Sequence, residues 1–166
     1  MEKEKFFEDA TKKLLKMIDS MGLEKLQRMR AKNFTLLFRD SFKLPDVRHQ
    51  TFWADLGDEG MAKLTYDSDG FCRAASLNFA KLMGNTKEWQ LMYIDRIWLY
   101  GPHHYLLHVP SKTILDLTYD QYDHAKMCIP YYLGKPIDME TYENDVADRF
   151  FDALNLQALM PNNQKD

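Results

Sequence analysis

The sequence predicts an α+β fold built as a single domain over residues 1–166. Three observations lead to this expectation. The chain has 166 residues, 45% of them apolar, which is the size and composition of one globular domain. Apolar residues recur at three- and four-residue spacing in its first third, as in amphipathic helices. Runs of aromatic and branched residues, typical of strands, follow in its middle third.

The helical N-terminal part, residues 1–42, is expected to hold two core-facing helices. The first apolar pattern covers residues 6–21, and the second covers residues 23–38 and ends before Pro45. Residues 43–67 combine proline, glycine and scattered aromatic residues, so we expect an irregular connection there.

The rest of the chain predicts one more helix, a sheet and a closing helix. A turn over residues 67–70 precedes a helix over residues 71–83, which Gly84 ends. Four strands are predicted, over residues 89–93, 96–100, 104–109 and 113–117. The last two flank a turn and form a hairpin. A closing helix over residues 138–160 completes the fold, with acidic residues in its first turns where the helix dipole favours them.

Charge and hydropathy exclude two classes of function. The net charge is −3 and no cluster of Lys and Arg interleaved with aromatic residues occurs, so we expect no nucleic-acid partner. No apolar run approaches the roughly 18 residues that cross a bilayer. Residues 1–9 mix both charges before any apolar stretch, unlike a signal peptide. We therefore expect a cytoplasmic protein that has no membrane partner.

Two cysteines, Cys72 and Cys128, are too few for a disulfide framework and predict free thiols in a reducing compartment. Cys72 falls in the first turn of the predicted helix 71–83, after the capping candidates Ser68 and Asp69. Unsatisfied backbone N–H groups at such a position stabilise a thiolate and can hold an oxyanion. Cys72 is therefore a candidate nucleophile, whereas Cys128, in an apolar stretch, is expected to be a packed thiol.

A histidine pair and an aspartate in the predicted hairpin can complete such a site. Asp116 lies between two leucines, and a carboxylate in an apolar strand needs a partner. A three-residue loop, 109–111, places His104 opposite Asp116, whereas a two- or four-residue loop places His103 on that face. We favour His104, so the predicted catalytic residues are Cys72, His104 and Asp116.

We expect no metal and no cofactor. His104 and His108 lie on one predicted strand, where four residues span roughly 13 Å, so the two rings cannot share an ion. The chain also lacks the HExxH and paired Cys-x-x-Cys motifs of zinc sites.

Three short motifs and Gln121 occur in a fixed order: Asp69-Gly70-Phe71-Cys72-Arg73-Ala74-Ala75-Ser76, His103-His104-Tyr105-Leu106-Leu107 and Ile114-Leu115-Asp116-Leu117-Thr118. This stretch, residues 66–122, resembles the papain-like cysteine hydrolase/acyltransferase superfamily in its transglutaminase-like branch. The resemblance implies a catalytic core in which a Cys-bearing helix packs on an antiparallel sheet. It also implies that Cys72 is the nucleophile, His104 the general base and acid, and Asp116 the group that orients the imidazole. Gln50 is a candidate for the oxyanion site, and Gln121 either caps a turn or takes part in catalysis.

These residues predict a thiol-dependent amide hydrolase or acyltransferase that acts on a protein or peptide amide through a thioester. The alternative is a non-catalytic binding or effector module on the same scaffold, in which Cys72 would be enclosed by apolar atoms. A third interpretation is a helical adaptor formed by residues 1–42.

Overall fold

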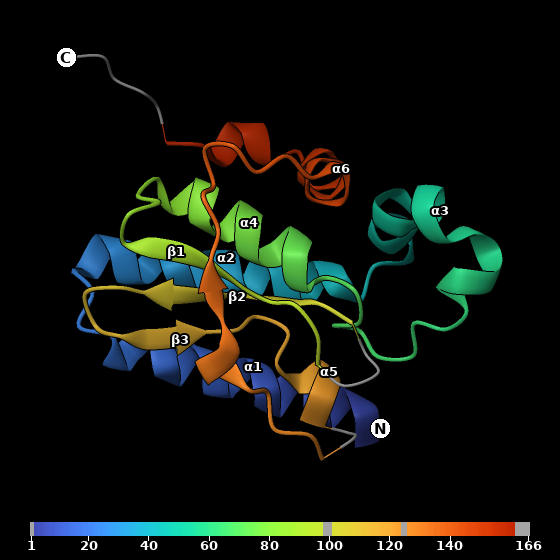
Figure 1. The fold of residues 1–166 in the computed structure, drawn as a ribbon, viewed down its shortest axis with the longest axis horizontal. Coiled ribbons are helices and arrows are strands. Elements are labelled where there is room, and N and C mark those ends of the chain that lie inside the picture. The colour runs from blue at the N-terminus through green and yellow to red at the C-terminus, as the bar shows by residue number, and fades with distance from the viewer. Residues whose placement is uncertain (1, 98–100, 124–125, 162–166) are drawn as a thin grey trace.

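A four-stranded antiparallel sheet with helices packed on it is the framework of the structure (Figure 1). The structure, a computed structural model, describes residues 2–97, 101–123 and 126–161. The strands, in the spatial order β3-β2-β1-β4, are β1 (Trp89–Ile94), β2 (His103–His108), β3 (Thr113–Leu115) and β4 (Lys135–Pro136). The helices are α1 (Glu2–Ser20), α2 (Lys25–Phe42), α3 (Pro45–Met61), α4 (Cys72–Met83), α5 (Asp120–Asp123) and α6 (Asp145–Ala153), with short 3₁₀ turns η1 (Tyr131–Leu133) and η2 (Leu156–Leu159). The predicted α+β class is thus confirmed.

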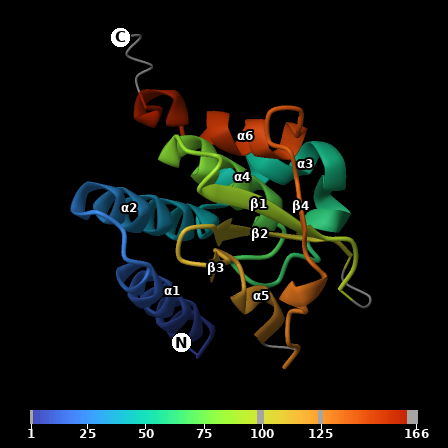
Figure 2. The ribbon, with the colours of Figure 1, turned by 60° about the vertical axis from the view of Figure 1, so that its left-hand side comes forward.

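The two faces of the sheet bury different sets of side chains. Helices α4 and α1 contact the sheet, α2 packs on both of these helices, and α6 packs on α4 (Figure 2). Leu106 and Leu115 join the main apolar cluster with these helices. Tyr105 and Met92, whose side chains point to the other face of the sheet, belong to a smaller cluster with residues 127–131. The alternation of side chains along each strand therefore gives the sheet two cores.

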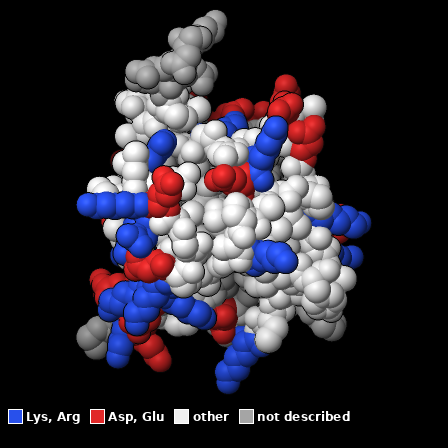
Figure 3. Space-filling model, turned by 90° about the vertical axis from the view of Figure 1, so that its left-hand side faces the viewer, with Lys and Arg blue, Asp and Glu red and all other residues white. Residues whose placement is uncertain are grey.

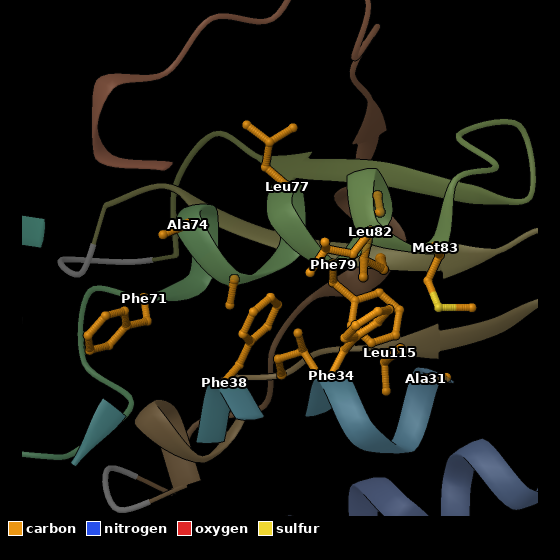
Figure 4. Close-up of a cluster of buried hydrophobic side chains, with 14 of the residues drawn as sticks. Ala31, Phe34, Phe38, Phe71, Ala74, Leu77, Phe79, Leu82, Met83 and Leu115 are labelled. Carbon is orange, nitrogen blue, oxygen red and sulfur yellow. The ribbon is translucent and has the colours of Figure 1, made fainter. Parts of the chain in front are cut away.

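Helix α4 is the central element, because it contacts the sheet, α2 and α6 together. Nearly all of its residues from Ala74 to Met83 are buried, as expected for a helix surrounded by other elements. Figure 4 shows Phe34 and Phe38 of α2 directed toward Phe79 of α4 and the neighbouring Leu115. Gly84 ends α4 in the left-handed conformation, with φ of 77°, so both predicted bounds of this helix are correct within one residue.

Helices α1 and α2 are part of the main core and also carry a buried ion pair. Arg39 of α2 is fully buried, and its Nη1 and Nη2 donate to the two carboxylate oxygens of Asp120 at 2.6 and 3.0 Å. Arg39 Nη1 also donates to the carbonyl of Leu117 at 3.0 Å. The N-terminal helices therefore hold the chain that follows Asp116 and belong to the main core.

The irregular connection predicted over residues 43–67 is wrong for most of its length, because α3 occupies Pro45–Met61. The predicted end of the second helix before Pro45 is confirmed, since α2 ends at Phe42, but Pro45 itself lies in the first turn of α3, where its missing N–H and fixed φ are favourable. Gly57, with φ of 59°, interrupts the helix with a kink.

Two other predicted elements differ from the observed structure. Of the predicted strand 96–100, Arg96 and Ile97 are not in a strand, and the Ile97 N–H donates to the Gly101 carbonyl at 2.9 Å; residues 98–100 lie outside the described residues. The closing helix begins at Asp145 rather than near residue 138, because the Asn144 side chain caps it by accepting from the Ala147 N–H at 3.0 Å.

The hairpin of β2 and β3 has a different loop from the predicted one. Leu106 pairs with Leu115 and His108 with Thr113, so the loop has four residues, 109–112. This register keeps Leu106 and Leu115 on the main-core face, whereas a three-residue loop would turn one of them away from it. Continued by one residue, the register places Asp116 across from Tyr105, on the face of His103. The predicted three-residue loop, and with it the pairing of His104 with Asp116, is wrong.

The surface carries charges of both signs. On the side shown in Figure 3, basic and acidic side chains lie close to one another around an uncharged area. Within the described part of the chain, no helix has the length and apolar character needed to cross a membrane.

Candidate active site

Cys72 is the first residue of α4 and lies beside His103 and His104, at the start of the central strand β2. The preceding Phe71 has φ of −79° and ψ of −5°, and the first helical hydrogen bond runs from the Ala75 N–H to the Phe71 carbonyl at 2.9 Å. The N–H groups of residues 72–74 thus have no acceptor within the helix. The predicted caps do not cap it: Asp69 instead accepts from the N–H groups of residues 65 and 66 at 2.9 Å each, which fixes the loop before α4.

His103 and Asp116 form a buried pair. His103 Nε2 lies 2.6 Å from Asp116 Oδ2, and the two side chains are 0% and 3% exposed. Asp116 lies one residue beyond the end of β3, so its backbone is released from the ladder while its side chain still reaches β2. Because the pair is removed from water, its charge interaction is only weakly screened.

Four hydrogen bonds hold the Asp116 carboxylate. Besides His103, Oδ2 accepts from the Tyr131 hydroxyl at 2.8 Å. Oδ1 accepts from the N–H of Thr118 at 3.1 Å and from its hydroxyl at 3.3 Å. Burial and the charge of Asp116 raise the pKa of Tyr131, so this phenol stays a donor. The carboxylate is therefore fixed as an acceptor that orients the His103 ring.

The other nitrogen of His103 lies among polar groups from α5. Its Nδ1 is 3.2 Å from Gln121 Nε2 and 3.4 Å from the hydroxyl of Tyr122. Gln121 Nε2 also donates to the Thr118 hydroxyl at 3.1 Å. The Gln121 side chain thus lies between His103 and the turn at Thr118, and its part in catalysis stays a prediction. Gln50, the other candidate, is exposed on α3 and does not line the pocket that contains Cys72.

His104 is also buried, but it has a different set of partners. Its Nε2 lies 3.2 Å from the hydroxyl of Tyr142, and its ring is 5.1 Å from that of Tyr93 on β1, measured between centroids. Its Nδ1 is buried and has no hydrogen-bond partner among the described groups. Leaving a buried imidazole nitrogen without a partner costs about 1–3 kcal/mol, so the group calls for an explanation.

The Cys72 thiol interacts with both imidazoles. Burial alone would raise its pKa, but the interactions of the thiol with His103 and His104 outweigh this and lower the pKa of Cys72 from 9.0 to about 5. Burial would likewise lower the pKa of His103, but Asp116 and the Cys72 sulfur raise it from 6.5 to about 10. Cys72 and His103 therefore form a thiolate–imidazolium pair at neutral pH.

A pocket of about 480 Å³ opens beside Cys72. Its lining combines apolar walls with charged side chains and the polar groups around His103: Phe52, Asp55, Leu56, Lys63, Leu64, Thr65, Asp69, Gly70, Cys72, Arg73, Pro102, Gln121, Tyr122 and Val146. Gly70 has φ of 81°, and a Cβ there would lie 3.2 Å from the Phe52 ring. Cys72 is a partly exposed residue and lines this space, so a ligand can reach it.

Cys128 differs from its prediction. It is exposed rather than packed, because it lies in the loop after α5, and both cysteines are free thiols. It lines a second pocket of about 360 Å³ that also touches Asp116 and Tyr131.

Sequence reasoning missed several residues that support the site, Tyr131 and Arg39 among them. Tyr131 follows Pro130 in a loop, and Arg39 lies within an amphipathic helix pattern, where a cation is ordinarily solvated. Neither position carries a local signal, since the partner of each lies far away in the sequence.

The chemistry available at the site comes from side chains and backbone N–H groups. Within the described residues, no group of three or more His, Cys, Asp or Glu side chains is arranged to hold a metal ion. The groups present are a thiolate, an imidazolium held by a carboxylate, a second imidazole and free N–H groups of a helix. Comparisons with protein-family models, with curated proteins and with solved structures gave no match.

Proposed function

We propose that this protein is a thiol-dependent acyl-transfer enzyme that acts on an amide through a thioester intermediate. The observation that carries the proposal is the arrangement of Cys72, His103 and Asp116, in which a helix-start thiol interacts with an imidazole that is 2.6 Å from a buried carboxylate. Nucleophile, base and orienting group in this order are what covalent acyl transfer requires. The fold supports a papain-like core of the transglutaminase-like branch, because α4 packs on β1 and β2.

The proposed reaction has two stages. The Cys72 thiolate attacks the carbonyl carbon to form a C–S bond, and the His103 imidazolium gives its proton to the leaving nitrogen as the C–N bond breaks. Water or an amine then attacks the thioester while His103 takes its proton, and the Cys72 thiolate leaves. Asp116 keeps the His103 ring in one orientation throughout and stabilises its charged form.

His104 is assigned a role different from that of the base. When the Tyr142 hydroxyl donates to His104 Nε2, the proton of the neutral ring is on Nδ1, the nitrogen without a partner. That N–H, together with the N–H groups at the start of α4, is suited to stabilise the oxyanion that forms next to Cys72. The cost of leaving Nδ1 unpaired would then be recovered in the transition state.

The non-catalytic alternative receives less support. It predicted a Cys72 enclosed by apolar atoms, whereas the thiol interacts with two imidazoles and lines a pocket.

An activated ester tests the proposal without knowledge of the natural substrate. In a Cys128→Ser background, which leaves one thiol, 4-nitrophenyl acetate should release a burst of 4-nitrophenol and leave one acetyl group on Cys72, detected by mass spectrometry. Cys72→Ala should abolish the burst, and His103→Gln should slow both formation and loss of the acetyl group. A wild-type protein that acquires no acetyl group on Cys72 would contradict the proposal.

A further inference from the structure

We propose that the pocket beside Cys72 binds an acidic acyl donor, an amide whose acyl part carries a carboxylate, and that Arg73 pairs with this carboxylate. The inference rests on the proposed function and names its substrate class. It is carried by the charges that line the pocket and by what each of them already contacts.

Arg73 is the cation nearest in sequence to the nucleophile and lines the same pocket. Among the described residues, no carboxylate lies within ion-pair distance of its guanidinium. The first turn of α4 contains no acidic residue that could neutralise it. Arg73 is partly buried rather than fully solvated, so its charge acts on the pocket with less screening than that of a surface arginine.

The two carboxylates of the pocket are already occupied. Asp55 forms an ion pair with Arg149 of α6. Asp69 accepts two backbone N–H groups of its own loop, both at 2.9 Å. Neither is therefore placed to pair with Arg73 or to recruit a cationic ligand.

The second cation of the pocket, Lys63, also favours an anionic ligand. Lys63 reaches Glu59 at 3.6 Å, but the two side chains are 74% and 92% exposed, so this pair contributes little and leaves the lysine available. The pocket thus presents two cations without strong partners and two carboxylates with partners. Between them, Phe52 and Leu64 give apolar walls that fit the carbon chain linking the reacting carbonyl to its anionic group.

Paired alkylating reagents test this preference on Cys72 itself. Iodoacetate and iodoacetamide share a leaving group and differ in charge, so the ratio of their rates cancels the thiolate content of Cys72 and its nucleophilicity. In the Cys128→Ser background, Arg73→Gln should lower the iodoacetate-to-iodoacetamide ratio by about fivefold at low salt, the size expected for one partly screened charge pair. Arg73→Lys should retain most of the ratio.

Lys81→Gln is the matched control, because it removes one cation from the other end of α4, about 12 Å away along the helix axis. It should leave the ratio unchanged. A second pair of probes reaches deeper into the pocket: 4-nitrophenyl hydrogen glutarate should acylate Cys72 faster than the neutral 4-nitrophenyl pentanoate of equal chain length, and Arg73→Gln should remove the difference.

The outcomes separate the two proposals. If both ratios are unchanged in Arg73→Gln while Cys72 still forms an acyl intermediate, the acidic donor is excluded and the proposed function stands. If Cys72 forms no acyl intermediate with any ester, both proposals fail. A ratio that falls equally in Arg73→Gln and Lys81→Gln would also overturn the assignment to Arg73, because it would reflect the overall charge of the protein.

Discussion

Replacing His103 with glutamine should raise the pKa of the Cys72 thiol by several units. In the native site this pKa is lowered from 9.0 to about 5, with His103 and His104 overcoming the effect of burial. At about 1.4 kcal/mol per unit, the ionised thiol is stabilised by about 5 kcal/mol relative to a free thiol. We assign most of this to His103, since the buried carboxylate of Asp116 holds its positive charge. Glutamine can still donate to Asp116, which keeps that carboxylate paired.

The assay is the pH dependence of Cys72 alkylation by iodoacetamide in the Cys128→Ser background. The midpoint should move from about 5 in the parent to above pH 8 in His103→Gln. A rate at one pH would be misleading, because a thiolate of higher pKa is also a better nucleophile. With a Brønsted coefficient of about 0.4–0.5, a rise of four units speeds the thiolate roughly 40- to 100-fold and offsets the loss of ionised thiol.

The matched variant His104→Gln distinguishes the two histidines. His104→Gln should shift the pH midpoint of Cys72 alkylation less than His103→Gln does. It should also slow the acylation of Cys72 by 4-nitrophenyl acetate, by more than the change in the thiol pKa accounts for. A midpoint that stays near 5 in His103→Gln and rises in His104→Gln would refute the assignment of the base and restore the sequence-based choice of His104.

Three further predictions concern stability, each measured by chemical denaturation. The Cys72–His103 pair holds as many protons as the unfolded side chains between pH 6.5 and 9, whereas the unfolded state binds one more below that window and one fewer above it. We therefore compare the unfolding free energy of the wild type with that of Cys72→Ser/His103→Gln. The difference should be constant between pH 6.5 and 9, and it should fall by about 1.4 kcal/mol per pH unit below this range, toward pH 5, and above it, toward pH 10. A slope between pH 6.5 and 9 would contradict the ion pair. Gly134→Ala should cost about 1–3 kcal/mol because the new Cβ would clash with the Tyr105 hydroxyl, and adding Tyr105→Phe should recover part of the loss; if it recovers none, the clash is not the cause. Arg39→Ala should cost about 3–5 kcal/mol because it leaves the carboxylate of its ion pair buried and alone, and a loss below about 1 kcal/mol would show that water reaches that carboxylate.

Local signals in the sequence were enough to predict helix α4 and to place Cys72 in its first turn. Cys72 at the start of a helix and Gly84 at its end follow from helix periodicity and termination chemistry, both of which act over a few residues. The unusual Asp116 between leucines likewise indicated a carboxylate with a buried partner. Pro45 shows the limit of such signals, since a proline can end one helix or begin the next, and in this chain it begins α3.

Which histidine meets Asp116 was decided only by the tertiary structure. The two registers of the hairpin differ by one residue, and apolar residues lie on both faces of its strands. The local sequence pattern is therefore compatible with both registers. Burial of Leu106 and Leu115 against the main core selects the four-residue loop, and that selection places His103 beside Asp116. The partners that complete the site are distant too, because Tyr131 lies 15 residues beyond Asp116. Contacts of this kind depend on the packing of the whole chain, so no short stretch of sequence determines them.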